Sequence, residues 1–201
     1  IVDRTRSVVK NNHWNNPGGI LAAVAKQYDM NMWEGQDKRP WCLIEKDALA
    51  GVFEGVCSEW DVPLLSCRGY ISQSAAWSAG IAMKRQFAQG LTPLILHFGD
   101  HDPSGMDMSR DLRERLTMFA EEDVELIRVA LNRDQVDEYN PPPNPAKTTD
   151  GRFAKYEEEH GNQSWELDAL EPSVLSDLLR DEVEKLIDRE AWDERQEVRE
   201  A

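Results

Sequence analysis

Three acidic residues stand where this sequence could do chemistry on a phosphate ester. Glu45 directly follows the apolar run 41–44, while Asp100 and Asp102 follow the apolar run 94–98 after a single glycine. Asp100 and Asp102 are two positions apart, so an extended chain would point both carboxylates the same way. Carboxylates that meet at one point repel each other unless a cation lies between them. We therefore predict that Glu45, Asp100 and Asp102 bind Mg²⁺ or Mn²⁺ and are the catalytic residues.

A simpler interpretation of the aspartate pair stays open. Asp102 precedes Pro103, and an acidic residue in that place could serve only as the N-cap of a helix. Gly99 and Gly105 bracket the pair and leave room for the backbone to approach a ligand. The presence of Glu45 at a second strand end favours the metal site over capping alone.

Two basic residues near these strand ends are weaker candidates for binding phosphate. Lys46 is next in the chain to the first acidic residue, and Arg68 lies in the loop after the second predicted strand. A guanidinium group suits phosphate well, but a solvated lysine and a surface ion pair are the simpler alternatives. His101 is expected to point away from the aspartates, and Glu166 and Asp168 are interpreted as surface or capping groups.

The elements that would position these residues alternate between strand and helix. Short apolar runs and helical periodicities follow one another with short connections, which is typical of a parallel sheet covered by helices on both faces. Ligands of such sheets bind at the carboxyl ends of the strands. We predict an α/β fold whose four-stranded, mainly parallel sheet comprises residues 41–44, 63–67, 94–98 and 124–131, with helices over 48–60, 72–89 and 106–119.

The flanking segments differ from this core in composition. Residues 1–39 are polar and rich in turns, with a short helical stretch over 20–28, and we interpret them as a lead-in from an upstream domain that this chain lacks. Residues 40–135 form the predicted core. Residues 136–201 are predicted to be a proline-rich loop followed by a helical C-terminal extension.

Composition restricts the function further. The 201 residues carry a net charge of −15, which opposes free-standing binding to duplex nucleic acid. The three cysteines form no CxxC pair, so we expect no zinc, three buried thiols and a cytoplasmic protein. No apolar run approaches the roughly 18 residues of a membrane helix, so we expect no membrane partner.

The segments "WCLIEKDAL" and "LILHFGDHDPSG" resemble the TOPRIM domain, which has a Glu after its first strand and an Asp-x-Asp after its third. The resemblance is closest to the A subunit of topoisomerase VI, the meiotic double-strand-break proteins and their phage and bacterial relatives. The turn 102–105 and the later segments "YNPPPNPAKTTDGRFAKYEEEHG" and "WELDALEP" extend it over about residues 40–190.

This resemblance implies a Rossmann-like TOPRIM fold and Mg²⁺-dependent cleavage and religation of DNA by Glu45, Asp100 and Asp102. It leaves open whether Glu45 binds the metal or transfers a proton. It also implies a homodimer with one active site for each DNA strand. The many apolar positions of residues 164–190 agree with an interface, although packing against the same domain would explain them as well.

One feature of that family is missing. Its members cut DNA with a tyrosine on a winged-helix domain that precedes TOPRIM, and none of Tyr28, Tyr70, Tyr139 and Tyr156 lies in a recognisable motif. We therefore identify no tyrosine nucleophile. Either an N-terminal winged-helix domain is missing here, or the chain is a stand-alone TOPRIM nuclease.

Two further functions remain as alternatives. A haloacid-dehalogenase-like phosphatase would use Asp100 as nucleophile, with Ser104 in place of the usual Thr. That motif normally follows the first strand of its domain, and it would leave Glu45 without a role. A non-catalytic dimerisation or scaffold module would fit the net charge and the absent tyrosine, but not the three acidic residues.

Overall fold

The computed structural model describes residues 13–25 and 30–200, and the chain divides into two compact units, residues 1–31 and 32–201. In the described part of the first unit, helix α1 spans Pro17–Ala25 and buries none of its residues. It begins three positions before the predicted helical stretch, whose last residues lie outside the described part. The second unit contains all the predicted site residues.

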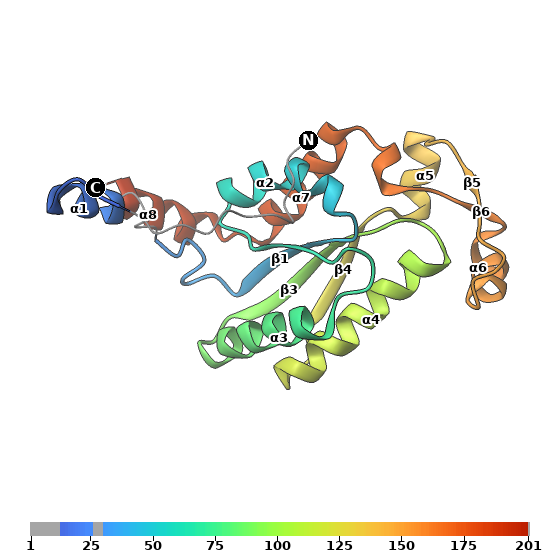
Figure 1. Cartoon of the computed structure of the whole chain (residues 1–201), viewed down its shortest axis with the longest axis horizontal. Coiled ribbons are helices and arrows are strands. Elements are labelled where there is room, and N and C mark those ends of the chain that lie inside the picture. The colour runs from blue at the N-terminus through green and yellow to red at the C-terminus, as the bar shows by residue number, and fades with distance from the viewer. Residues whose placement is uncertain (1–12, 26–29, 201) are drawn as a thin grey trace. The chain divides into compact units, whose positions relative to one another are not determined.

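A four-stranded parallel sheet forms the centre of the second unit, as predicted (Figure 1). Its strands are β1 (Lys38–Ile44), β2 (Leu64–Ser66), β3 (Thr92–Phe98) and β4 (Glu125–Ala130), in the order β2-β1-β3-β4. All three strand pairs are parallel, so the sheet is entirely rather than mainly parallel. Ile44 is level with Ser66 on one side and with Phe98 on the other, so these strands end at one edge.

Helices cover both faces of the sheet because side chains along each strand point alternately to the two sides. On one face, Cys42, Ile44 and Leu96 belong to a core that includes α2 (Ala50–Glu59) and α7 (Pro172–Leu186). On the other, Leu43 and Ile95 pack with α3 (Gln73–Ala88) and α4 (Pro103–Ala120). The predicted fold class, an α/β sheet with helices on both faces and a helical C-terminal extension, is confirmed.

The remaining elements follow the sheet in the chain. These are α5 (Arg133–Tyr139), α6 (Phe153–His160), α8 (Arg189–Glu200), the 3-10 helices Asp47–Leu49 and Leu167–Ala169, and the antiparallel pair β5 (Asn144–Pro145) and β6 (Gln163–Ser164). Figure 1 shows α6 with β5 and β6 beside the C-terminal edge of the sheet, near the start of α4.

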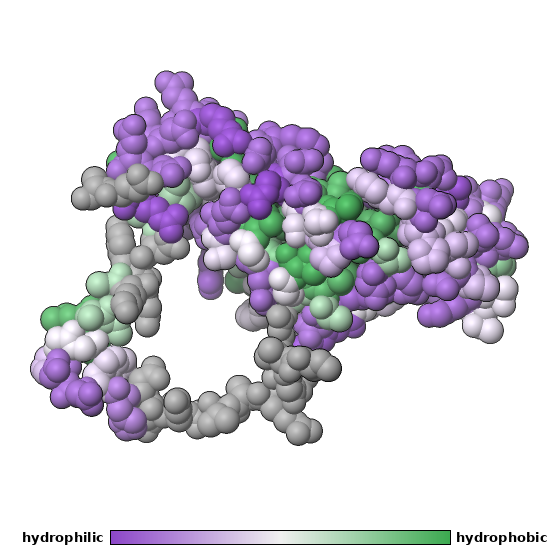
Figure 2. All heavy atoms as spheres, turned by 90° about the horizontal axis from the view of Figure 1, so that it is seen from above, coloured by the Kyte–Doolittle hydropathy of each residue, from purple (hydrophilic) through white to green (hydrophobic). Residues whose placement is uncertain are grey.

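The apolar positions of the C-terminal extension are used within the unit itself. Leu175, Leu179 and Val183 of α7 are buried in the core on the α2 face, and Leu178 and Leu186 pack against it. Residues 164–190 therefore offer no separate argument for an interface. Seen from above, the larger unit is mostly hydrophilic with a smaller hydrophobic area open to view (Figure 2).

The cysteines and the absence of long apolar runs were both considered in the sequence. Cys42, Cys57 and Cys67 are free thiols, and all three are buried, as predicted. Within residues 13–25 and 30–200, no helix has the length and apolarity needed to cross a membrane.

Candidate active site

The ends of β1 and β3 bring Glu45 and Asp100 together, although 55 positions separate them in the chain. The Glu45 amide continues the ladder by donating to the Phe98 carbonyl at 2.9 Å. Its side-chain Oε2 accepts a hydrogen bond of 2.9 Å from the Asp100 amide. Both side chains are nearly buried, with 8% of Glu45 and 5% of Asp100 exposed. The site therefore lies at the carboxyl edge of the sheet, between its two central strands.

A second set of contacts fixes the Asp100 carboxylate. Its Oδ1 accepts a hydrogen bond of 2.7 Å from the Leu167 amide and forms an ion pair of 3.1 Å with Lys46 Nζ. The other oxygen, Oδ2, takes no hydrogen bond from any residue that the structure describes, and the same holds for Glu45 Oε1. Each carboxylate thus keeps one oxygen for another ligand.

Asp102 serves as the N-cap of α4, as the simpler interpretation predicts. Its Oδ1 accepts from the Gly105 amide at 2.6 Å, and the Ser104 hydroxyl lies 2.9 and 3.1 Å from its two oxygens. Capping starts α4 at Pro103, three residues before the predicted start. Capping does not separate Asp102 from the other two acids, since its negative charge contributes to the raised pKa of Glu45.

Burial and charge together raise the pKa values of both buried acids. Burial, followed by the negative charges of Asp100 and Asp102, raises the pKa of Glu45 to about 7. Burial also raises the pKa of Asp100 to about 6, although the Leu167 amide and the Lys46 ammonium oppose the shift. A cation binds favourably where negatively charged groups are crowded together and partly shielded from solvent.

The donor set fits a hard divalent cation, with one restriction. Glu45 Oε1 and Asp100 Oδ2 are oxygen donors without a described protein partner, and such donors suit Mg²⁺ or Mn²⁺ with waters completing the shell. In the described ranges, however, no three His, Cys, Asp or Glu side chains are arranged as a ready cluster of ligands. Asp102 is held in its capping position by the Gly105 amide and the Ser104 hydroxyl.

Lys46 is held by acids rather than left in solvent. Besides Asp100 it forms ion pairs with Glu166 and, at 3.0 Å, with Asp168. Although burial opposes the shift, hydrogen bonds to these carboxylates raise the pKa of Lys46 above its usual range. The interpretation of Glu166 and Asp168 as surface groups was therefore incomplete, because both reach the candidate site through Lys46.

Residues 164–168, which the sequence pattern did not assign to the site, contact residues 99–102 between β3 and α4, which we call the acidic loop. We call residues 164–168 the C-terminal strap. Trp165 and His101 pair through two backbone hydrogen bonds of 2.8 and 2.9 Å. Two positions later, the Leu167 amide donates to the Asp100 carboxylate. Nothing in the local pattern of "SWELD" indicates these contacts, because their partners lie more than 60 positions earlier.

Arg128 was also not predicted to belong to the site, although the sequence pattern around it indicated a buried contact. It is a single cation in the apolar strand β4, "ELIRVA". Its guanidinium donates to the carbonyls of Gly99, Asp100 and Gly105 at 3.0, 2.5 and 3.0 Å and to the Ser109 hydroxyl at 2.8 Å. Burial lowers its pKa to about 10 despite the nearby acids. A guanidinium group withdrawn from solvent requires such acceptors, so this isolated cation in an apolar strand indicated a polar loop at the strand end.

The other basic candidate, Arg68, lies at the expected edge of the sheet. The Gly69 amide bonds the Glu45 carbonyl at 3.1 Å, which places this loop beside the site. The Arg68 side chain is 57% exposed and pairs with Asp47 at 3.4 Å. This is the surface ion pair considered as the alternative to phosphate binding.

The His101 ring contacts a tyrosine. Its Nδ1 lies 2.8 Å from the hydroxyl of the buried Tyr156, and burial and the neighbouring His160 lower its pKa to about 4. The Tyr70 hydroxyl donates to Asp107 at 2.6 Å, and Tyr139 ends α5. Tyr28 lies outside the described residues.

Comparisons with known proteins do not assign this chain to a family. Neither the models of protein families nor the curated protein sequences contain a match to the chain.

Proposed function

We propose that this chain is a Mg²⁺- or Mn²⁺-dependent DNA-processing domain of the TOPRIM type, similar to the A subunit of topoisomerase VI. The observation that carries the proposal is the meeting of Glu45 and Asp100 at adjacent strand ends, each with one oxygen free of described protein partners and with Asp102 two positions on. The residues that would hold the cation are Glu45 and Asp100, with Asp102 completing the set. When bound there, a divalent cation stabilises negative charge on the oxygens of a phosphodiester under attack.

The protein residues have separable tasks in this proposal. A carboxyl group with a pKa of about 7, such as Glu45, can accept or donate a proton near neutral pH, which suits general acid–base work. Arg128 and the C-terminal strap both hold the backbone of the acidic loop. Lys46 neutralises part of the negative charge at the site while no phosphate is bound.

Calorimetric titration with Mn²⁺ tests the proposal. We expect one cation to bind the wild type and none to bind Asp100→Ala/Asp102→Ala. The variant Glu157→Ala/Glu158→Ala is the matched control, because it removes two exposed acids of α6 and should bind as the wild type does. Equal binding by all three proteins would refute the site.

DNA assays then separate the alternatives. Because the net charge is −15 and no tyrosine nucleophile is identified, we expect weak binding to duplex DNA and slow, Mn²⁺-dependent nicking that is lost in Asp100→Asn. Rapid nicking by the chain alone would favour a stand-alone nuclease. Hydrolysis of p-nitrophenyl phosphate without any nicking would favour the phosphatase alternative, and the absence of both metal binding and activity would favour a scaffold.

A further inference from the structure

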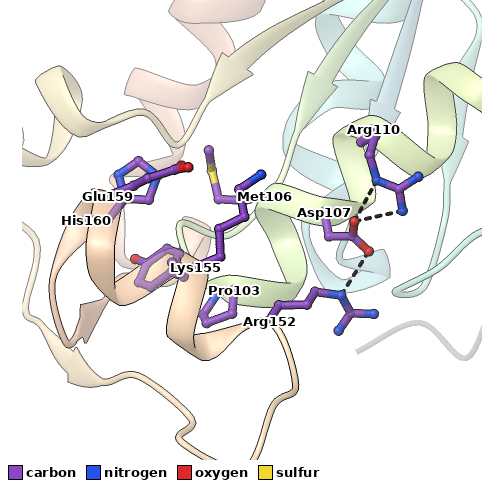
Figure 3. A pocket seen from close by; sticks show the side chains of 9 residues that line it. Pro103, Met106, Asp107, Arg110, Arg152, Lys155, Glu159 and His160 are labelled. Carbon is purple, nitrogen blue, oxygen red and sulfur yellow. Dashed lines mark hydrogen bonds and ion pairs between the residues drawn. The ribbon is translucent and has the colours of Figure 1, made fainter.

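A pocket of about 270 Å³ lies between α4 and α6, next to the acidic loop (Figure 3). Positions 103, 106, 107 and 110 of α4 line one side, and positions 152, 155, 156, 159 and 160 at the start of and along α6 line the other. Both sets repeat every three or four residues, so each is one face of a helix. The Tyr156 hydroxyl also donates to the His101 carbonyl at 3.0 Å, which connects the pocket to the residue between the two aspartates.

Asp107 organises the cationic side of this pocket. Its Oδ1 accepts from Arg110 Nε at 2.8 Å, and its Oδ2 accepts from Arg152 Nε at 2.9 Å and from the Tyr70 hydroxyl at 2.6 Å. Figure 3 shows the carboxylate between the two guanidinium groups. Although burial opposes it, hydrogen bonds from Tyr70 and Arg110 lower the pKa of Asp107, so the carboxylate stays charged and holds both arginines in place.

Two donors at the pocket remain available for a ligand. Lys155 forms no ion pair with any described residue. Arg152 donates to Asp107 through Nε and to Asp150 through Nη1, and its Nη2 atom has no described acceptor. Three cations, Arg110, Arg152 and Lys155, line the pocket. Arg110 also pairs with Glu114 and Arg152 with Asp150, so Lys155 and Nη2 of Arg152 are the donors left for a ligand. Donors left in this way favour an anion, and a guanidinium group favours phosphate.

The rest of the lining is apolar. Pro103, Met106 and the ring of Tyr156 contribute surface without charge. The volume lies near the lower end, about 300 Å³, of pockets that hold small molecules, so the pocket admits one small ligand and not a duplex. A group that combines a phosphate with a flat, weakly polar ring matches both parts of the lining.

We propose that the α4–α6 pocket binds one unpaired nucleotide of a DNA strand. Its phosphate lies at Lys155 and the arginine pair, and its base lies against Met106 and Pro103. The identity of the ligand as DNA rests on the proposed function. The pocket would hold the strand next to the bond that Glu45 and Asp100 act on, and Lys155 and Arg152 would supply the donors that retain a cut or single-stranded end.

Fluorescence anisotropy tests this with the full chain in EDTA, which removes the candidate metal site from the measurement. The probe is a 3′-fluorescein-labelled, 5′-phosphorylated single-stranded oligothymidylate. Lys155→Glu is compared with Lys185→Glu, an exposed position of α7 that changes the net charge equally. Since Lys155 has no described partner, its substitution should leave the fold intact, which circular dichroism checks.

We expect Lys155→Glu to weaken binding about fivefold or more, Lys185→Glu to weaken it less than about twofold, and thymidine monophosphate to compete better than inorganic phosphate. Equal effects of the two variants would overturn the pocket, and equal competition by inorganic phosphate would overturn the nucleotide. Lys155-dependent oligonucleotide binding by a wild-type chain that neither binds Mn²⁺ nor nicks DNA would support the pocket while refuting the proposed function.

Discussion

His97 shows how one buried titratable side chain makes the stability of this protein depend on pH. It is fully buried in β3, where Nδ1 lies 2.9 Å from the Ser109 hydroxyl and Nε2 has no hydrogen-bond partner among the described residues. Burial, followed by the charge of Arg128, lowers its pKa to about 3. Between this value and about 6.5, the unfolded chain binds a proton that the folded chain does not. The contribution of His97 to stability therefore falls as the pH decreases through this range, while the raised pKa values of Glu45 and Asp100 act in the opposite direction.

Replacing His97 by Leu should remove that dependence. Leu has a similar volume, and Ser109 keeps its bond from Arg128. Between pH 7.5 and pH 5, we expect the free energy of unfolding of His97→Leu to improve relative to the wild type by about 1–2 kcal/mol. Urea denaturation at both pH values measures this. His101, whose pKa is also lowered, is present in both proteins, so parallel pH curves would contradict the assignment to His97.

At the scale of elements, the junction between β3 and α4 depends on a close backbone approach. An added Cβ at Gly105 would lie 2.2 Å from the Asp100 carbonyl oxygen, and the backbone there is already held by Arg128. Gly105→Ala should therefore destabilise the fold by about 1–3 kcal/mol and displace Asp100. Urea denaturation and Mn²⁺ titration would measure the two effects.

Gly55→Ala is the control for that substitution. Gly55 is an exposed position within α2, and an added Cβ there meets nothing within 4 Å. Because alanine favours helix over glycine, we expect this variant to gain about 0.5–1 kcal/mol. A Gly105→Ala protein as stable as Gly55→Ala would show that the junction tolerates a side chain.

The strands and two of the site residues could be predicted from the sequence, whereas the contacts made by the C-terminal strap could not. The four strands were predicted because buried parallel strands are short apolar runs, and each observed strand overlaps its predicted range. Glu45 and Asp100 were predicted to be neighbours because parallel strands end at one edge. The strap and the partners of Lys46 could not be predicted, since they depend on how the chain returns after 120 positions. The role of Arg128 could have been predicted, because an isolated cation in an apolar strand requires buried acceptors.

At the scale of the whole molecule, the remaining prediction concerns assembly. The resemblance to topoisomerase VI implies a homodimer, and this expectation no longer draws on α7, whose apolar side chains face their own core. We expect light scattering across a concentration series to report twice the 23.0 kDa mass of the chain. A mass that stays monomeric at the highest soluble concentration would contradict it.

The C-terminal strap has a consequence for how the protein is made. Ribosomes release a chain from its N-terminus at roughly 5–20 residues per second, and earlier segments can fold while later ones are still being added. Glu45 and Asp100 emerge before the strap: Asp100 gains its Leu167 bond only after 67 more residues, and Lys46 meets Glu166 only after 120. A chain cut short by a premature stop before residue 164 carries every acidic residue of the triad and lacks the segment that fixes them. Products of translation that end before residue 164 therefore lack the contacts that fix the candidate site, and these contacts can form only after residue 167 has been added.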